Sequence, residues 1–501
     1  MEKKNYIVGV DIGSSNVVVA VGCRRPDGKV SVEGIALQSV DNGVTSGRID
    51  NAKSVGMAIS KAKTELEEEL GIRIDSAYAG ISGSFVRCAT CTDHVFIKDP
   101  MGCIAKEDLA SLHERMCGVM ADDSEQIMER IPQTYIIDNT KETTTPVGAF
   151  GRMLSATYLF VLCNKVQIDR VKMAFHNAGL QLIDICVNPS ILPSALLSDE
   201  EREEGVAVID LGGGTTDVAI VKGGALRYIA SLPIGASTIN ADMCAAGISE
   251  RKTESVKKKY GSAVAESVSP DATFLISMPG LAKKEFLQVN LASIIEARLK
   301  DIIEFAWGEI RSAKFTQKIP CGIVLTGGSA LLDNIDELFH RETGVNVRLA
   351  TAQDFGGIDE ESQCKIQPYA NSAAVALLLY GARNGGVCGV SEPAFPRPNS
   401  VLRAAATQPQ ATPSHEAVAT DPIREEPVKH EPVATEPIKP EPVKAEPKPT
   451  EPTEKPTQEP ADVDYDDDDE ERPKEKRGGI FGKIANFIDN VLGGGNNNEY
   501  L

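Results

Sequence analysis

The sequence predicts an α/β protein with two duplicated lobes that face each other, followed by a long polar tail. Strand-like and helix-like segments alternate through residues 1–385, which is typical of an α/β architecture. Two aspartate–glycine turns, at Asp11 and Asp210, each follow a strand-like segment, and this recurrence indicates duplication. The composition then changes sharply after about residue 390, where the folded part is expected to end.

The length and charge of the chain limit the number of domains and the kinds of partner that it can have. A chain of 501 residues with 42% apolar residues predicts two or three domains with a sizeable core. The formal net charge of −20 argues against nucleic acid as a partner. The charge is concentrated, because residues 416–477 hold 20 acidic and 10 basic side chains.

The expected elements follow in chain order. Residues 6–10, 17–21 and 30–36 read as successive strands separated by Gly, Asp and Ser turns. Residues 51–70 carry apolar side chains on one helical face. A second set begins with a strand at 205–210, and residues 291–306 form a strongly amphipathic helix.

We expect no targeting signal at the beginning of this sequence. It runs from a charged start directly into a strand, without the apolar core of a signal peptide. No stretch approaches the ~20 apolar residues of a spanning helix. We therefore expect the protein to be made and kept in the cytoplasm.

The tail is rich in proline and acidic residues. Residues 421–460 contain eleven prolines. From Pro422 to Pro452 a proline recurs every five residues, each preceded by Asp or Glu. Such a segment cannot bury enough apolar surface to fold, and regular prolines favour an extended spacer. A second reading, in which the repeat is a ligand for a partner domain, stays open.

A short amphipathic helix is expected near the end of the chain. One helical face gathers the apolar side chains of Ile480, Phe481, Ile484, Phe487, Ile488, Val491 and Leu492. Lys476, Arg477 and Lys483 supply positive charge. At ~1.5 Å per residue this helix is about 20 Å long, too short for a bilayer core of ~30 Å. It is therefore expected to lie in the membrane interface, although docking in a groove of the protein is an alternative.

Three glycine-rich turns carry the candidate chemistry. They are Asp11-Ile-Gly-Ser-Ser-Asn, Asp210-Leu-Gly-Gly-Gly-Thr-Thr-Asp and Leu325-Thr-Gly-Gly-Ser-Ala. Carboxylates at strand ends can hold a hydrated Mg²⁺, and glycines let backbone N–H groups approach phosphate oxygens. The hydroxyls of Ser14, Ser15, Thr215 and Thr216 add donors. We expect a nucleotide between the two lobes, in a site without the Walker pattern GxxxxGK[ST].

These turns resemble the phosphate-binding hairpins of the actin superfamily of ATPases, which includes sugar kinases and DnaK-type chaperones. Further segments resemble the FtsA family of bacterial cell-division proteins. Residues 253–261 resemble its segment with a Glu and a Lys near the nucleoside, here Glu254 and Lys257. Residues 131–138 and 146–154 resemble its inserted subdomain, and 368–381 its closing helix. The resemblance covers roughly residues 5–385 and the terminal helix.

The resemblance implies a particular domain order. Its ranges are 1–82 and 164–195 for lobe I, 83–163 for the inserted subdomain, 196–388 for lobe II, 389–478 for the linker and 479–493 for the membrane helix. The lobes are expected to be ribonuclease-H-like. The expected ATP-binding residues are Asp11, Gly13, Ser14, Ser15, Asn16, Asp210, Gly212, Gly213, Gly214, Thr215, Thr216, Glu254, Lys257, Gly327, Gly328 and Ser329. Asp11 and Asp210 are expected to hold Mg²⁺ through water.

The resemblance also implies a function. Members of this kind bind ATP, polymerise like actin and anchor the ring protein FtsZ to the membrane at the division septum, helping to recruit later division proteins. Asn188 stands where many relatives carry a Glu that positions the attacking water, and Asn cannot act as a base. Weak or no hydrolysis is therefore expected.

Other functions of the same fold remain as alternatives. They are a kinase or chaperone ATPase, a pilus-assembly scaffold similar to PilM, and a filament similar to MreB. A sugar-kinase site and a chaperone substrate domain are both missing from the sequence pattern. The inserted-subdomain motifs and the terminal helix favour division.

Overall fold

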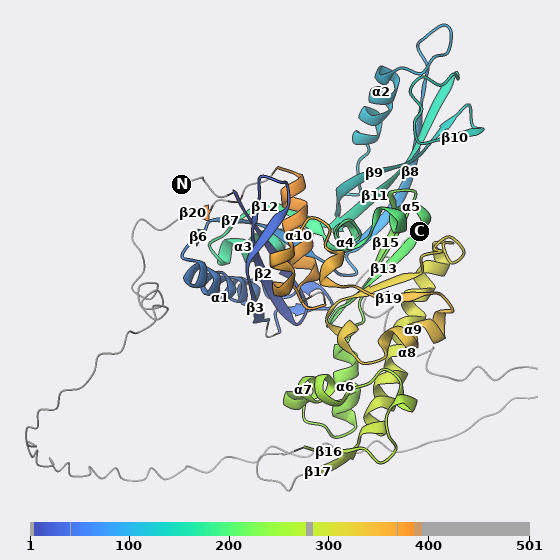
Figure 1. Cartoon of the computed structure of the whole chain (residues 1–501). Helices are drawn as coiled ribbons and strands as arrows, with labels where there is room; N and C mark the ends of the chain where they lie inside the picture. Colours follow the sequence, from blue (N-terminus) through green and yellow to red (C-terminus); the bar gives the residue numbers. More distant parts are fainter. Residues whose placement is uncertain are drawn as a thin grey trace, which may run out of the picture. The chain divides into compact units, whose positions relative to one another are not determined.

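The computed structural model describes residues 5–40, 42–276, 284–367, 369–385, 388 and 390–391, and Figure 1 shows their arrangement. The predicted linker beyond residue 391 and the predicted membrane helix lie outside the described residues. No described helix combines the length and apolarity needed to cross a membrane.

The first lobe is built on a five-stranded mixed sheet of order β12-β7-β1-β2-β3. Its strands are β1 (Asn5–Ile12), β2 (Asn16–Arg24), β3 (Val30–Ser39), β7 (Ser76–Ile81) and β12 (Gln181–Val187). Strands β1, β2 and β3 are antiparallel neighbours, whereas β7 runs parallel to both β1 and β12. The first three strands predicted from the sequence are therefore confirmed. Strands β1 and β2 are nearly continuous apolar runs, because helices cover both faces of this sheet.

The second lobe repeats the same strand order. Its sheet runs β15-β14-β13-β18-β19, from β13 (Val206–Leu211), β14 (Thr216–Lys222), β15 (Ala225–Leu232), β18 (Ile323–Thr326) and β19 (Val347–Leu349). Again three antiparallel strands are followed by two parallel ones. The duplication predicted from the two aspartate turns is thus present in the fold.

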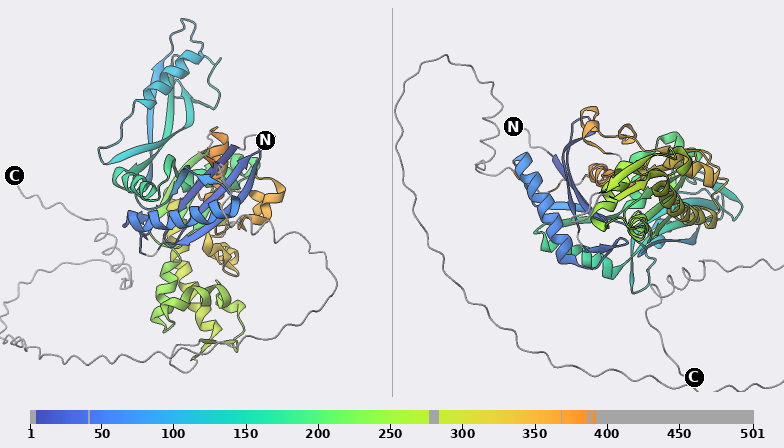
Figure 2. Two further views of the ribbon diagram at one scale, coloured as in Figure 1. Left: turned by 90° about the vertical axis from the view of Figure 1, so that its left-hand side faces the viewer. Right: turned by 90° about the horizontal axis from the view of Figure 1, so that it is seen from below.

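Helices surround the two sheets (Figure 2). The helices of the first lobe, and of the segment that leads from it to the second lobe, are α1 (Ala52–Leu70), α3 (Lys165–Asn177), α4 (Asn188–Leu196) and α5 (Asp199–Glu204). Those of the second lobe are α6 (Ser237–Ala245), α7 (Glu250–Tyr260), α8 (Gln288–Ser312) and α9 (Ile335–Thr343), followed by α10 (Ser372–Arg383). Helix α1 begins where the Asn51 side chain accepts from two backbone N–H groups, and it ends at Gly71 in the left-handed conformation.

Short elements complete the two lobes. Paired strands are β4 (Val44–Thr45) with β5 (Arg48–Ile49), β6 (Arg73–Ile74) with β20 (Val390–Ser391), and β16 (Thr273–Ile276) with β17 (Lys284–Leu287). The 3-10 turns are η1 (Ala265–Ser267), η2 (Gly328–Leu331), η3 (Ala352–Asp354) and η4 (Glu360–Lys365).

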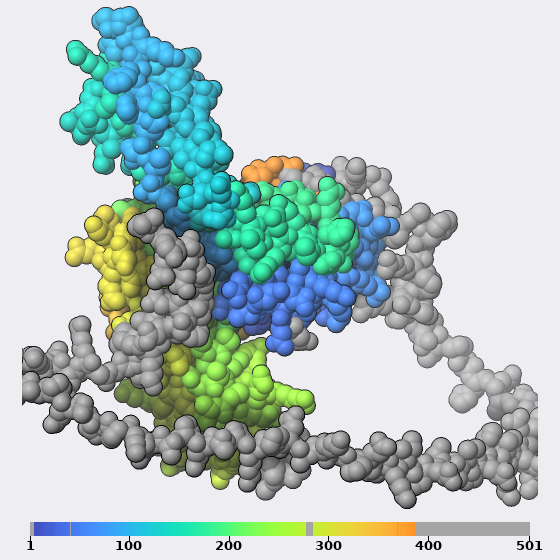
Figure 3. Space-filling model, turned by 180° about the vertical axis from the view of Figure 1, so that it is seen from behind, coloured from blue at the N-terminus to red at the C-terminus, as the bar shows by residue number. Residues whose placement is uncertain are grey.

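The inserted part has a core of its own. It contains β8 (Val86–Phe96), α2 (Lys106–Cys117), β9 (Glu125–Ile137), β10 (Lys141–Thr143) and β11 (Met153–Asn164), with sheet order β10-β9-β11-β8. Helix α2 packs on this antiparallel sheet around Leu112, Met116, Leu154 and Tyr158. Strand β8 alternates between more and less exposed side chains, as expected for a sheet covered on one face. Figure 3 shows the insertion, in cyan, standing clear of the lobes at its far end.

Helix α10, the last of the described helices, is buried in the first lobe although it comes near the end of the described part of the chain. Apart from Tyr380 and Arg383, its residues from Ser372 onward are all buried, as expected for a helix that is apolar all round. Its small side chains allow close packing, since Gly381 lies directly against Ile7 and Tyr78. The chain therefore closes the first lobe with residues from its end, although the sequence placed 196–388 together as lobe II.

Two helical glycines should respond in opposite ways to substitution by alanine. A Cβ at Gly381 would lie 2.7 Å from Ile7 Cγ2 and 2.8 Å from Tyr78 Cε2, so Gly381→Ala should lower the free energy of unfolding by about 1–3 kcal/mol. A Cβ at Gly308 in α8 would have its nearest contact at 3.9 Å. Gly308→Ala should therefore stabilise the protein, by up to about 1 kcal/mol. Urea unfolding measures both, and a shift in the same direction for the two variants would contradict this packing.

Candidate functional site

A cleft of about 730 Å³ lies between the two lobes, within the usual range for a small-molecule site. Residues from both sheets line it, including the turns that follow β1, β13 and β18. No residue of 83–163 is among the described lining residues. The cleft is therefore made by the duplicated lobes and not by the insertion.

The two aspartate turns have the same backbone geometry. In the first, which joins β1 to β2, the Gly13 N–H donates to the Asn16 carbonyl at 3.0 Å. In the second, which joins β13 to β14, the Gly212 N–H donates to the Thr215 carbonyl at 2.9 Å. Each turn thus closes over four residues at the edge of its sheet. Asp11 and Asp210 stand just before these turns and both line the cleft.

Side chains of the first turn lie against backbone of the second. A Cβ at Gly213 would lie 2.1 Å from Ser15 Oγ, and one at Gly214 would lie 2.5 Å from Ser14 Oγ. The Ser14 hydroxyl also accepts from the Gly47 N–H at 2.8 Å. Only glycine allows this approach, so backbone N–H groups and hydroxyls from both lobes meet in one place.

The third turn supports the carboxylate of the second. Gly327 has a φ of 89°, a conformation that favours glycine. A Cβ there would lie 2.2 Å from Asp210 Oδ1. Because β18 runs parallel to β13, the turns after these two strands are neighbours at the same sheet edge, and Gly327, Gly328 and Ser329 complete this side of the cleft.

Three carboxylates are crowded in the cleft. Burial raises the pKa of Asp11 to about 6, although a hydrogen bond from Asn188 opposes the shift. Burial also raises the pKa of Asp217 to about 6, against hydroxyl donors from Ser231 and Ser82. The pKa of Asp210 is raised well above its usual range by burial and by the charges of Asp217 and Asp11. Each charge therefore disfavours the others.

The donor set of this cluster fits a hard divalent cation such as Mg²⁺. Carboxylate oxygens are ligands that Mg²⁺ prefers, and a cation would offset the burial that raises the pKa of Asp11 and Asp210 and the repulsion that adds to it. Asp11 and Asp210 are the residues that could hold it through water, because no three acidic, His or Cys side chains among the described residues are grouped to ligate a metal directly. Such a cation would supply charge neutralisation for phosphate oxygens at the adjacent glycine turns.

The other end of the cleft carries an ion pair on α7. Lys257 Nζ lies 2.7 Å from Glu254 Oε2 and donates to Asn240 Oδ1 at 3.0 Å. Burial works to raise the pKa of Glu254, but Lys257 and Asn240 hold it below its usual range. The exposed apolar side chains of Leu37 and Leu331 line the same cleft. The cleft therefore offers polar groups and apolar surface, a combination suited to an aromatic base and its sugar.

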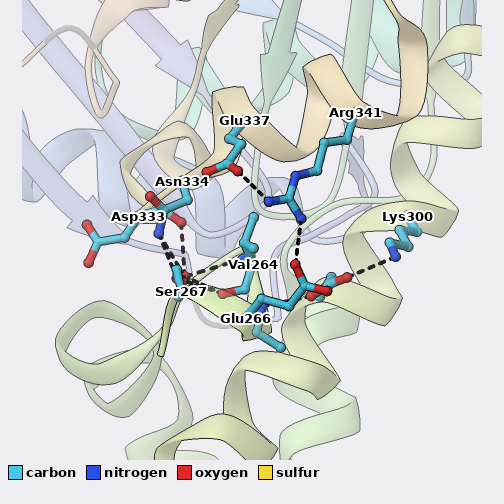
Figure 4. A network of polar contacts seen from close by, with 11 residues as sticks. Val264, Glu266, Ser267, Lys300, Asp333, Asn334, Glu337 and Arg341 are labelled. Atoms are coloured by element: carbon cyan, nitrogen blue, oxygen red, sulfur yellow. Dashed lines mark hydrogen bonds and ion pairs between the residues drawn. The ribbon is translucent and has the colours of Figure 1, made fainter. Parts of the chain in front are cut away.

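A polar network holds the wall of the cleft behind the third turn (Figure 4). Asn334, with a φ of 62°, donates through Nδ2 to Ser262 Oγ at 3.1 Å and Ser267 Oγ at 3.0 Å. Arg341 on α9 joins Glu337 and Glu266. The network ties α9 to the segment around η1, and this fixes the neighbouring Asp333, which lines the cleft.

The structure brings most of the predicted binding residues to this cleft. Asp11, Gly13, Ser14, Ser15, Asn16, Asp210, Gly212, Gly213, Thr215, Glu254, Lys257, Gly327, Gly328 and Ser329 line it. Gly214 and Thr216 are not among the lining residues. Thr216 is buried, and its hydroxyl donates to the Ile234 carbonyl at 2.9 Å. Asn188 also lines the cleft and donates to Asp11 Oδ1 at 2.8 Å.

Sequence reasoning missed several lining residues, of which Asp217 and Ser82 matter most. The Ser82 hydroxyl lies 2.7 and 2.5 Å from the two carboxylate oxygens of Asp217, and so joins the lobes. The duplication of the two sheets could have predicted the position of Ser82. Strand β7 holds the place in the first sheet that β18 holds in the second, so the residues after Ile81 correspond to the glycine turn after Thr326.

Two sheets of the same strand order, with a glycine hairpin from each facing one cleft, define an actin-like protein. The solved structure of a PilM–PilN type IV pilus biogenesis complex has this fold. Its similarity has a TM-score of 0.52 at 15% sequence identity and covers 75% of this chain and 98% of that chain. At this identity the likeness concerns the fold alone.

Comparisons of sequence are more specific. Residues 207–374 match the family model described as cell division protein FtsA, and residues 83–162 match the SHS2 domain inserted in FtsA. The FtsA proteins of Pseudomonas aeruginosa and Bacillus subtilis are each 29% identical to this chain. These matches cover 76% and 78% of the chain, and 90% and 86% of the two relatives. The chain is therefore similar to FtsA proteins over most of residues 5–385, including the inserted domain.

The cleft carboxylates should make stability depend on pH. The folded pKa of Asp11, about 6, lies above its ordinary value of 3.8. The stability contributed by its protonated form is therefore present below pH 3.8 and lost as pH rises through about 6. Asp11→Asn cannot ionise and keeps an oxygen that can accept from Asn188. Without divalent cations at pH 7.5, this variant should be about 1–3 kcal/mol more stable than the unaltered protein.

Thermal unfolding in EDTA from pH 4 to pH 8 measures this difference, which should shrink toward pH 4. The exposed Asp169, paired with Lys172 at 3.0 Å, provides the control Asp169→Asn, which should show no such gain. A constant difference across the pH range would contradict a raised pKa at Asp11.

Proposed function

We propose that this chain is an ATP-binding cell-division protein that links the FtsZ ring to the membrane. The observation that carries the nucleotide part is the pair of matching glycine hairpins, each beside a partly buried carboxylate with a raised pKa, in one cleft. Phosphates would lie at the backbone N–H groups of 13–16 and 212–215, with Mg²⁺ held by Asp11 and Asp210. The nucleoside would lie toward Glu254 and Lys257.

Hydrolysis is proposed to be weak. Asn188 donates its amide N–H to Asp11, so it acts on a carboxylate and cannot itself remove a proton from water. In this proposal the nucleotide sets conformation and assembly of the actin-like body more than it serves as a substrate.

The cell-division part rests on the similarity to FtsA proteins and on the pattern at the end of the sequence. The relatives are named cell division protein FtsA, and this supports a role at the division site with FtsZ, further division proteins and further copies of the chain as partners. The likeness to the PilM–PilN complex concerns only the fold and supports no pilus role. The apolar face of 480–492 and the basic residues beside it support a peripheral attachment to the inner face of the membrane.

Asp210→Ala should weaken binding of ATP in the presence of Mg²⁺ by about tenfold or more, because the cation and the second phosphate turn lose a carboxylate. Isothermal titration with ATP, with and without Mg²⁺, measures the loss. The control Asp169→Ala changes an exposed carboxylate on α3 and should leave the affinity unchanged. Equal affinity in the unaltered protein and a folded Asp210→Ala variant would refute the site.

Membrane attachment should depend on the apolar face of the terminal segment. Phe487→Glu should reduce sedimentation of the full chain with anionic liposomes by about tenfold or more, because a buried large side chain contributes roughly 1.5–3 kcal/mol. Asn486→Glu adds the same charge on the opposite face of the expected helix and should retain most of the binding. If both variants sediment like the unaltered chain, the attachment lies elsewhere.

A further inference from the structure

Helix α4 begins inside the cleft. Its first residue, Asn188, is 4% exposed, and its Nδ2 donates to Asp11 Oδ1 at 2.8 Å. The Oδ1 atom of the same amide is buried and has no hydrogen-bond partner among the described residues, and it lies where a Cβ at Gly80 would approach to 2.5 Å. One hydrogen bond and close packing therefore orient this amide, so the position of the helix start decides how Asn188 meets Asp11.

The insertion contacts the same helix two residues later. The Ser190 hydroxyl is hydrogen-bonded to Glu129 Oε1 on β9 and also lies 2.9 Å from the Val187 carbonyl. A serine has one hydroxyl proton, so it can serve only one of these two acceptors at a time. When the hydroxyl donates to the Val187 carbonyl, it stabilises the first turn of α4. When it donates to Glu129, it links that turn to the insertion.

The surroundings of Glu129 affect its hydrogen bond with Ser190. Burial raises its pKa, a hydrogen bond from Ser190 opposes the rise, and the charge of Asp184 adds to it. A neutral Glu129 could donate to Ser190 while Ser190 donates to Val187, which would satisfy all three groups in one chain. The carboxyl thus belongs to the insertion but takes its hydrogen bond from the helix that begins in the cleft.

The insertion also contacts strand β15, which carries a hydroxyl that binds a cleft carboxylate. On β15, the Ser231 hydroxyl donates to Asp217 Oδ1 at 2.5 Å. Two residues earlier, the Ile229 carbonyl accepts from Cys88 Sγ on β8 at 3.2 Å. Gln133 Nε2 on β9 donates to the Leu226 carbonyl at 2.8 Å. The insertion is therefore docked on two elements, α4 and β15, that each hold a cleft carboxylate.

We propose that Ser190 and Glu129 are positioning residues of the cleft: the docked insertion fixes the start of α4, and through it the contact of Asn188 with Asp11. This rests on the proposed binding of a Mg–nucleotide complex between the lobes. Since coupling between two sites is reciprocal, the bound complex also strengthens docking of the insertion. The effect concerns the cation side of the site, because Asp11 is a candidate cation residue and the nucleoside end lies on α7.

Ser190→Ala in the full chain removes the shared hydroxyl. At a fixed ATP concentration, the Mg²⁺ concentration for half-saturation should rise about fivefold or more, whereas the ATP affinity measured in EDTA should stay within about twofold. A general loss of structure would lower both. Ser190→Thr keeps the hydroxyl and should restore the Mg²⁺ dependence.

Ser194→Ala is a matched control. Ser194 lies on the same helix, and its hydroxyl donates to the carbonyl three residues earlier, Ile191, at 2.8 Å, as Ser190 can donate to Val187. This variant should behave like the unaltered chain. In the unaltered chain, Mg–ATP should also slow amide hydrogen exchange in β9 around Glu129, and Ser190→Ala should abolish this protection.

The outcomes separate the two ideas. If the unaltered chain binds no nucleotide, the proposed function fails and the coupling falls with it. If the unaltered chain binds Mg–ATP but Ser190→Ala shows the same Mg²⁺ dependence and the same exchange in β9, the coupling is overturned while the nucleotide site stands. If Ser194→Ala has the same effect as Ser190→Ala, the role is helix stability and the proposal is likewise wrong.

Discussion

Three carboxylates are gathered where two lobes meet, and much of the chain around them is arranged to hold them there. Asp11 and Asp210 lie on β1 and β13, which are equivalent strands of the two sheets. Asp217 lies on the neighbouring strand β14 and accepts hydrogen bonds from hydroxyl groups of both lobes. Like charges this close raise one another's pKa. The proposed binding of a cation and phosphates would offset this repulsion.

Several parts of the fold were within reach of sequence reasoning because local pattern and tertiary structure agree there. The aliphatic runs of β1 and β2, the capped helix α1 and the amphipathic α8 all follow from residue spacing. The glycine turns follow strands, and strands of equivalent position in duplicated sheets must end at the same edge. That is why fourteen of the sixteen expected binding residues line one cleft.

Other features depend on contacts that no local pattern carries. Gly214 and Thr216 belong to the second turn but are not among the residues that line the cleft, because Gly214 lies against Ser14 of the other lobe and Thr216 is buried with its hydroxyl on the Ile234 carbonyl. Ser82 and Leu37 line the cleft through the packing of distant strands. The burial of α10 in the first lobe and the contact of Glu129 with Ser190 join residues far apart in sequence, which periodicity does not relate.

The insertion also manages an exposed sheet edge. Strand β15 is at the end of its sheet, and unpaired backbone groups at such an edge can recruit other strands. Cys88 Sγ contacts both the N–H and the carbonyl of Ile229, and Gln133 Nε2 donates a hydrogen bond to the Leu226 carbonyl. The same surface that docks the insertion therefore protects the second lobe from unwanted pairing.

The burial of α10 has a consequence for how the protein is made. Residues 5–12 of β1 pack against residues 372–383, so the first lobe cannot be completed until nearly the whole folded part has left the ribosome. At typical rates of ~5–20 residues per second, that interval is on the order of tens of seconds. During it, the aliphatic face of the first sheet has no native cover. We expect the second lobe, whose strands are closer together in the chain, to fold first and the first lobe to remain a client of chaperones until α10 emerges.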